Sequence, residues 1–187
     1  MFTMFKHTLW ISLFLSSLSF AHSQNCSDPA IVQFVQKAKG VVHDIKYMTL
    51  ATADVSAAPW NTPLYTAYEA NFRSFYWISE KTSHHSQNVR ANNRVFVVIY
   101  DSTAPGREGF GVYMQGQAYE LNEVPDIAKG VKAIFERAEA AFPSPTEYQG
   151  TRPQRIYKFL PLKFWVNTVV EIDGKEIDKR VEITDCI

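Results

Sequence analysis

The sequence has little cysteine, no excess of either charge and no long hydrophobic run. Cys26 and Cys186 are its two cysteines, and no CxxC pair, zinc-ligand spacing or nucleophilic cysteine motif accompanies them. Lys and Arg total 19, as do Asp and Glu, so no global field attracts nucleic acid or an anionic membrane. Repeats, low-complexity tracts, Ser-His-Asp sets and Walker motifs are also missing. The 187 residues, 46% hydrophobic and 14% aromatic, fit a single globular domain.

The first 23 residues are typical of a secretory signal peptide. Lys6 precedes the uncharged apolar run Leu9–Phe20, and Ala21 and Ser23 are small residues at the positions that a signal peptidase reads. This run is shorter than the roughly 20 residues that a membrane-spanning helix needs. We therefore predict a signal peptide at residues 1–23, one domain at 24–187, export to the periplasm or the exterior, and no stable membrane insertion after cleavage.

The two cysteines lie near the two ends of the mature chain. An even pair in an oxidising compartment can form a disulfide, which here would tie the ends together. The sequence leaves open whether Cys26 and Cys186 pair or remain free in frayed tails, because pairing depends on geometry.

Strand patterns dominate the mature chain. Helices are predicted at residues 27–40, where Gly40 ends the helix, and at 82–93 and 124–142. A bend or bulge is expected at Gly116. Strands are predicted at residues 47–54, 60–69, 74–79, 94–102, 110–121 and 155–167, followed by a hairpin around Asp173-Gly174-Lys175. Without regular alternation of strands and helices, this order favours an antiparallel, barrel-like α+β domain.

The doublet His84-His85 stands between two strand patterns. A shared metal ion is disfavoured, because adjacent residues point to different sides of a helix or strand, and the mature chain has one further histidine, His43. A phosphate is a better ligand, since the predicted helix would begin here and helix N-termini attract anions. Hydroxyl and amide side chains surround the doublet at Thr82, Ser83, Ser86 and Asn88. A solvated polar turn would explain the same residues without a ligand.

Four consecutive motifs resemble the FMN-binding split-barrel family of pyridoxamine 5′-phosphate oxidase-like proteins. They are PWNTPLYTAYE (59–69), FYWIS (75–79), TSHHSQNVRANNRVFVVIYDSTAPG (82–106) and GVYMQGQAYEL (111–121), and RIYKFLPLKFWVN (155–167) resembles the family's closing strand. The resemblance extends over residues 42–167. It implies a six-stranded antiparallel Greek-key split barrel with flanking helices, and a homodimer that binds FMN between its subunits.

The resemblance also implies which residues contact FMN. Phosphate contacts fall on Thr62, Ser79, Ser83, His84 and His85. The flavin ring would face the backbone of Leu64, Trp77 and Ile78, with Trp165 as a wall from the partner subunit. Ordinary core packing is the alternative role for both tryptophans.

Two departures from the family pattern shape the expected activity. Thr62, His84 and His85 stand where the family has arginine or lysine, so phosphate binding should be weaker and more pH-dependent. Residues 169–187 lack the substrate-binding arginine-histidine motif of true pyridoxamine phosphate oxidases. We therefore predict an FMN-dependent oxidoreductase for an unidentified small molecule other than a B6 vitamer. A non-enzymatic binder of flavin, haem or a deazaflavin is the alternative, and an exported structural protein with an empty cleft is a third.

Overall fold

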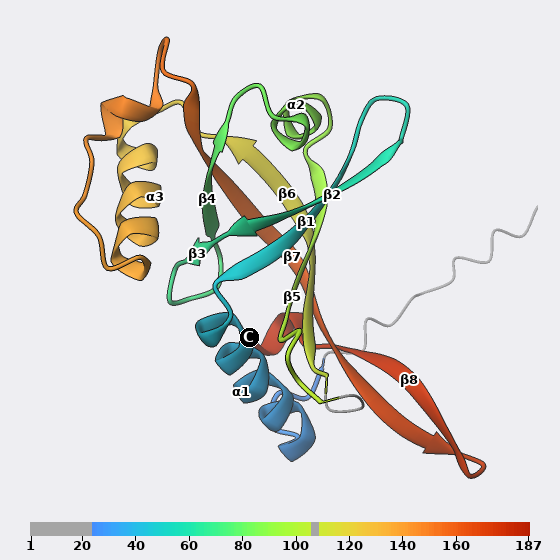
Figure 1. Ribbon diagram of the computed structural model, residues 1–187. Coiled ribbons are helices and arrows are strands. Elements are labelled where there is room, and N and C mark those ends of the chain that lie inside the picture. The colour runs from blue at the N-terminus through green and yellow to red at the C-terminus, as the bar shows by residue number, and fades with distance from the viewer. Residues whose placement is uncertain (1–23, 106–108) are drawn as a thin grey trace, which may run out of the picture.

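The computed structural model describes residues 24–105 and 109–187, so the predicted signal peptide lies outside the described residues. Eight strands form one sheet whose pairings are all antiparallel, with three α-helices around it within these residues (Figure 1). No helix in this part of the chain is long and apolar enough to cross a membrane. The elements are α1 Pro29–Asp44, β1 Tyr47–Ala53, β2 Pro59–Tyr65, β3 Ala67–Tyr68, β4 Phe75–Glu80, α2 His84–Ala91, β5 Arg94–Tyr100, β6 Gly111–Glu120, α3 Val124–Arg137, β7 Gln154–Ile172 and β8 Lys175–Glu182.

The sheet curves round so that its two ends approach each other. Its strand order is β2-β1-β5-β6-β7-β4-β3, with β8 paired to β7. The end strands β2 and β3 are separated in the chain by Thr66 alone, whose hydroxyl donates to the carbonyl of Tyr76 on β4 at 3.2 Å. The structure confirms the predicted antiparallel α+β split barrel, with eight strands rather than six.

Alternation along the strands places the main core inside the barrel. Leu50, Val97, Met114 and Phe164 stand opposite one another across β1, β5, β6 and β7, and all four side chains are buried. Side chains of a strand point to alternate faces, so every second residue of these strands lines the interior. The register between β6 and β7 shifts at Gly116, where the sequence predicts a bulge.

Helices α1 and α3 both end away from their predicted boundaries. α1 continues past Gly40 to Asp44, because Val42 is fully buried in the main core and its packing outweighs the low helix propensity of glycine. α3 ends at Arg137 rather than 142, and Glu139 after it has a left-handed backbone with φ of 53°. Gly130 lets α3 lie close to the outside of β4 and β7, where a Cβ would approach Ile156 Cγ2 to 2.5 Å.

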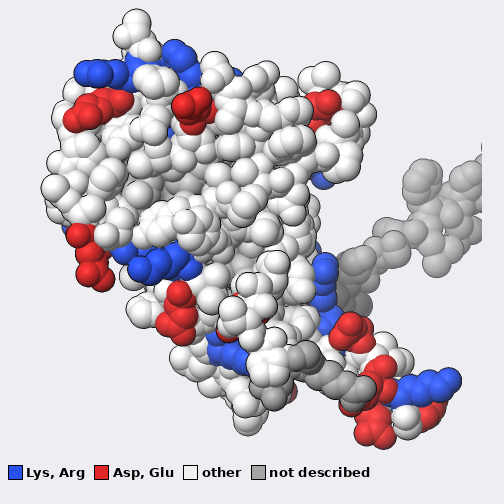
Figure 2. Space-filling view, in the orientation of Figure 1, with Lys and Arg blue, Asp and Glu red and all other residues white. Residues whose placement is uncertain are grey.

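β7 and β8 form a hairpin that projects from the barrel (Figure 1). The tail pattern was predicted as separate short strands, but β7 is one strand of 19 residues that continues beyond the end of β6. The predicted turn is present, and Asp173 and Gly174 both have positive φ, as two-residue hairpin loops require. Lys, Arg, Asp and Glu side chains lie side by side on the projecting tip (Figure 2).

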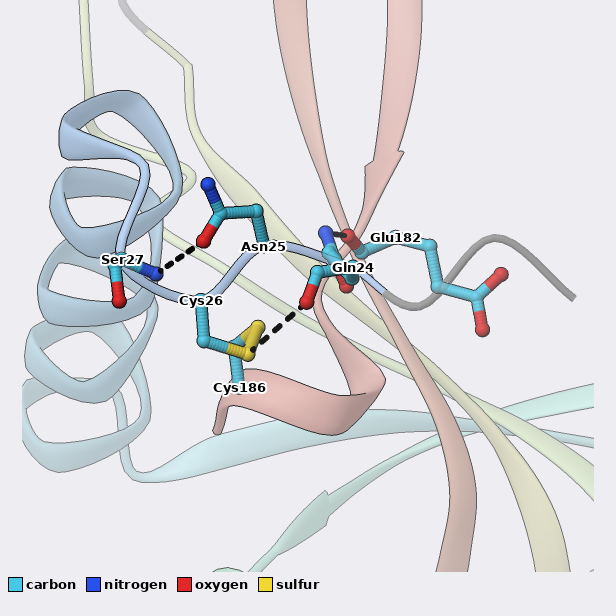
Figure 3. Close-up of a disulfide and its surroundings, with 6 residues drawn as sticks. All are labelled: Gln24, Asn25, Cys26, Ser27, Glu182 and Cys186. Carbon is cyan, nitrogen blue, oxygen red and sulfur yellow. Dashed lines mark hydrogen bonds between the residues drawn. A yellow bond between two sulfur atoms is a disulfide. The ribbon is translucent and has the colours of Figure 1, made fainter.

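A disulfide joins the two ends of the described chain. Cys26, just before α1, and Cys186, in the last turn, have Cα atoms 5.3 Å apart (Figure 3). Gln24 adds a second link through its side-chain amide, which donates to the carbonyl of Glu182. The structure thus decides the pairing that the sequence left open.

Candidate functional site

Four polar side chains meet where β4 leads into α2. Ser79 is the second-last residue of β4, and the turn that follows Glu80 brings Ser83 and the imidazole of His85 beside it. His85 Nε2 lies 2.8 Å from Ser79 Oγ and 3.1 Å from Ser83 Oγ, and Ser83 Oγ donates to Ser86 Oγ at 2.8 Å. We call Ser79, Ser83, His85 and Ser86 the α2 cluster. It unites three of the predicted phosphate residues and adds Ser86.

The α2 cluster surrounds a helix start that has no side-chain cap. Ser83 occupies the N-cap position, but its hydroxyl is directed to His85 and Ser86 rather than to a backbone N–H of α2. The first N–H groups of a helix lack intrahelical acceptors, and the helix dipole makes this end partly positive. Hydroxyl, imidazole and backbone donors therefore meet in an arrangement suited to an anion.

His84 points away from the α2 cluster. Its ring is exposed and stacks on Trp60 with centroids 4.4 Å apart and planes 18° apart. Trp60 in turn donates from Nε1 to Thr62 Oγ1 at 2.8 Å. The two histidines thus have different surroundings, and Thr62 and His84 belong to one polar and aromatic layer rather than to the cluster itself.

His85 is held mainly in its neutral form. Burial, and to a lesser degree the charge of His84, lowers its pKa below the ordinary value of 6.5. A neutral imidazole offers one N–H donor and no charge. A phosphate dianion beside the ring would favour the protonated form and raise this pKa.

A partly buried network that was not predicted lies beside the α2 cluster and joins residues of α2, β6 and β7. Tyr157 donates to Glu120 Oε2 at 3.0 Å, and burial raises the pKa of Tyr157 to about 12. Glu120 also accepts from Arg90 at 2.9 Å and pairs with Arg155 Nε at 3.3 Å. Arg155 stands directly opposite Ser79 in the sheet. These residues are far apart in sequence, so only the pairing of β4 with β7 reveals the network.

Family membership follows from a comparison with protein-family models. The model described as "Pyridoxamine 5'-phosphate oxidase" matches residues 34–166, from within α1 to the second half of β7. The chain belongs to the pyridoxamine 5′-phosphate oxidase family. This match covers more than half of the chain and confirms the resemblance drawn from its motifs. No curated protein matches the sequence.

Solved structures share the fold of this oxidase-family chain at low sequence identity. A putative 5-nitroimidazole antibiotic resistance protein from Bacteroides thetaiotaomicron is 11% identical, with a TM-score of 0.59 over 70% of this chain and 81% of that one. HutZ, a heme storage protein from Vibrio cholerae, is 14% identical. Its TM-score is 0.54, and the match covers 72% of this chain and 89% of HutZ. An F420 reductase is 15% identical. Its TM-score is 0.50, and the match covers 68% of this chain and 94% of the reductase.

The residues whose backbone was predicted to face the flavin ring, together with Trp165, direct their side chains to different parts of this family member. Leu64 and Trp77 point into the main core, where Trp77 is 0% exposed and stacks on Tyr157 at 5.3 Å. Ile78 packs with the α3 side of the sheet. Trp165 lies on the outer face and stacks on Phe96 at 6.3 Å, and no contact joins it to the α2 cluster within the described chain. Their roles toward a flavin remain predictions.

Trp60 is the main site residue that the motif comparison missed. It lies two residues before Thr62 on β2, so both side chains are on the same face of the strand. That spacing could have identified it from the sequence. A cavity of 390 Å³ also lies beside α2, and its lining includes two cations at Lys81 and Arg90 together with Thr82, Gln87 and Glu120.

Proposed function

We propose that this member of the pyridoxamine 5′-phosphate oxidase family binds FMN at the start of α2 and uses it in a redox reaction on a small molecule. The α2 cluster carries the proposal, because it gathers three hydroxyls and an imidazole at a helix N-terminus without a side-chain cap. These donors fit a phosphate group in number and kind. FMN is the flavin that the family resemblance implies.

The residues of the chain would bind and orient the cofactor. Ser79, Ser83 and Ser86 can donate hydroxyl hydrogens to phosphate oxygens, and His85 can donate an N–H. Trp60 and His84 form an aromatic wall beside these donors. When bound, the isoalloxazine supplies the electron and hydride transfer, so the chain needs no separate acid–base set for an oxidoreductase activity.

A homodimer formed through the outer face of the barrel belongs to the same proposal. Phe96, Val98, Tyr113 and Trp165 are half-buried neighbours on that face, across β5, β6 and β7. Contiguous aromatic and aliphatic side chains on a surface are typical of protein interfaces. A second subunit there would bury Trp165, which the resemblance assigns to the flavin site. Export is proposed as well, and the Cys26–Cys186 disulfide supports it because such bonds persist in oxidising compartments.

The proposal predicts that His85→Ala weakens FMN binding more than riboflavin binding. Only FMN carries a phosphate, and loss of a hydrogen bond to a charged group costs about 1.5–3 kcal/mol, or roughly 10- to 100-fold in affinity. Fluorescence titration of both ligands measures the difference. His84→Ala should have a smaller effect, because His84 contacts Trp60 rather than the cluster.

His43→Ala is the matched control for this titration. His43 is exposed on α1 and pairs with Asp44, so its loss should leave both affinities unchanged. Equal losses of FMN and riboflavin in His85→Ala would contradict the phosphate role. Absence of a flavin absorption band from the wild-type protein after incubation with FMN and removal of the free flavin would contradict the function itself.

A second candidate function is haem binding. His84 presents an exposed imidazole stacked on an aromatic ring, and imidazole is a common axial ligand of haem iron. The fold shared with HutZ, a heme storage protein, supports this candidate. A Soret band that shifts in His84→Ala, together with no flavin band, would favour haem over FMN.

A further inference from the structure

A cavity of about 530 Å³ lies where the last turns of α3 approach the end of α1 and the turn between β3 and β4 (Figure 1). Small-molecule sites in proteins commonly measure roughly 300–1,000 Å³. Within the described chain, the lining of this cavity includes no residue of α2, so the cavity is separate from the proposed flavin site. We call it the α3 cavity.

The lining of the α3 cavity combines an apolar surface with charged groups. The apolar part is formed by Ala67, Tyr68, Ala70 and Ala133. Three exposed pairs at the rim join Lys129 to Asp126, Lys132 to Glu136 and His43 to Asp44. Arg137 and Glu69 are the two remaining ionic side chains of the lining, and both are half-buried. Within the described chain neither forms an ion pair, with the other or with a third residue.

Arg137 is held in place with part of its guanidinium still available. Nη2 donates to the carbonyls of Val42, His43 and Ile45 at 2.9–3.0 Å, and the guanidinium carbon lies 4.9 Å from the ring centroid of Tyr68. Within the described chain these hydrogen bonds use Nη2 alone, which leaves Nη1 and Nε as donors. Burial disfavours the charged guanidinium and lowers its pKa, so a carboxylate beside it would stabilise the charge.

Glu69 supplies the opposite charge from the turn after β3. Its Oε1 accepts a hydrogen bond from the hydroxyl of Tyr76 at 2.6 Å, and its backbone bonds to Phe72 and Ser74 fix the turn. The other carboxylate oxygen accepts no hydrogen bond within the described chain. A carboxylate held in this way is suited to an ammonium group, because hydrogen bonds between ionised partners are the strongest.

We propose that the α3 cavity binds a small zwitterion with an apolar side chain, of the kind represented by free amino acids. Arg137 binds the carboxylate, Glu69 binds the ammonium group, and Tyr68 with the three alanines contacts the side chain. A simple anion or cation would pair with one of the two charges and leave the other unpaired, whereas a zwitterion pairs with both. The site shares no residue with the α2 cluster, so it does not depend on the flavin proposal.

Ligands that share one side chain test the need for both charges. L-phenylalanine carries both, 3-phenylpropionate only the carboxylate and 2-phenylethylamine only the ammonium group. L-leucine, 4-methylpentanoate and isopentylamine repeat the comparison with a branched side chain. In titration calorimetry at least one amino acid should bind the wild type about ten-fold or more tightly than either of its analogues, because each analogue loses a charge-assisted hydrogen bond. No binding of either amino acid at millimolar concentration, or equal binding of the analogues, would overturn the proposal.

Two variants locate the site. Glu69→Gln keeps an acceptor for Tyr76 but removes the charge, so it should weaken amino-acid binding about ten-fold and should not weaken binding of the carboxylate analogue. Ala70→Trp places a large side chain at an exposed position of the lining and should abolish binding of every ligand. Glu171→Gln makes the matched change on exposed β7 and should bind like the wild type.

Wild-type amino-acid affinity in Glu69→Gln would overturn the assignment of the ammonium group, and wild-type affinity in a folded Ala70→Trp would place the ligand elsewhere. Equal melting temperatures establish that the variants are folded. FMN titration of the same variants should give the wild-type affinity, because the α3 cavity and the α2 cluster share no residue. Loss of FMN binding in the wild type would contradict the proposed function and leave the amino-acid result standing.

Discussion

His85 holds its imidazole in surroundings that disfavour the charged ring. The side chain is 8% exposed, and burial is the larger cause of its lowered pKa. The folded protein therefore binds fewer protons at this position than the unfolded chain as the pH falls through 6.5. Stability then decreases with decreasing pH in this window, because protons favour the state that binds more of them.

The free energy of unfolding without FMN should thus fall between pH 7.5 and pH 5, and His85→Gln should reduce that loss. Glutamine keeps a hydrogen-bond donor but does not titrate. Urea unfolding at the two pH values measures the effect, and His43→Gln serves as the control that keeps the wild-type loss. Asp54 and Asp101 titrate below 3.8, outside this window. If the free energy of unfolding of His85→Gln depends on pH as in the wild type, His85 is not the group that causes this loss of stability.

The site residues show which features of the site could be predicted from sequence patterns and which could not. The position of His84-His85 at a helix start was predictable, because a cap residue and a polar run precede it. Which histidine is buried was not, since Ser79 from β4 holds one ring and Trp60 from β2 stacks on the other. Arg155 and Glu120 escaped prediction for the same reason, as their contacts depend on strand pairing.

Among the secondary-structure elements, strands agreed with their patterns better than helix ends did. Alternation of apolar residues identifies a strand locally, as in β1 and β5. The ends of α1 and α3 depend on contacts with distant segments. Arg137 of α3 donates to the carbonyls of Val42 and Ile45 at the end of α1, so the two ends stabilise each other.

The bulge between β6 and β7 requires glycine at position 116. A Cβ there would lie 2.1 Å from the Leu160 carbonyl oxygen and 2.7 Å from the Phe159 ring, so backbone must move. We expect Gly116→Ala to lower the free energy of unfolding by about 3 kcal/mol, the upper range for overpacking. Urea unfolding measures this change.

Gly40→Ala is the matched control on α1. A Cβ added at Gly40 would meet no atom within 4 Å, and alanine in a helix is about 0.5–1 kcal/mol more stable than glycine. This variant should therefore be slightly stabilised. Equal stability losses in both glycine variants would argue against a specific close contact at the bulge.

On the scale of the whole molecule, the barrel was predictable and the length of its projecting hairpin was not. The order of strands without alternating helices indicated an antiparallel α+β domain, which the structure and the family match confirm. The continuation of β7 into a projecting hairpin was missed, because Val169 and Ile172 lie on a strand whose apolar residues are exposed. A pattern of alternating apolar residues predicts a strand with a buried face, and it does not reveal where a strand continues beyond the barrel.

The Cys26–Cys186 disulfide constrains the unfolded chain more than any local contact could. It closes a loop with a sequence separation of 160 residues, and loop-closure entropy for a loop of this size corresponds to about 5 kcal/mol. Measured effects are commonly smaller, so Cys26→Ser/Cys186→Ser should lower the free energy of unfolding by about 2–5 kcal/mol. Reductant should bring the wild type to the level of this variant and leave the variant unchanged in urea unfolding. The α2 cluster lies on other elements, so FMN affinity in the absence of denaturant should stay the same. A variant as stable as the oxidised wild type would show that the bond does not restrain the unfolded chain.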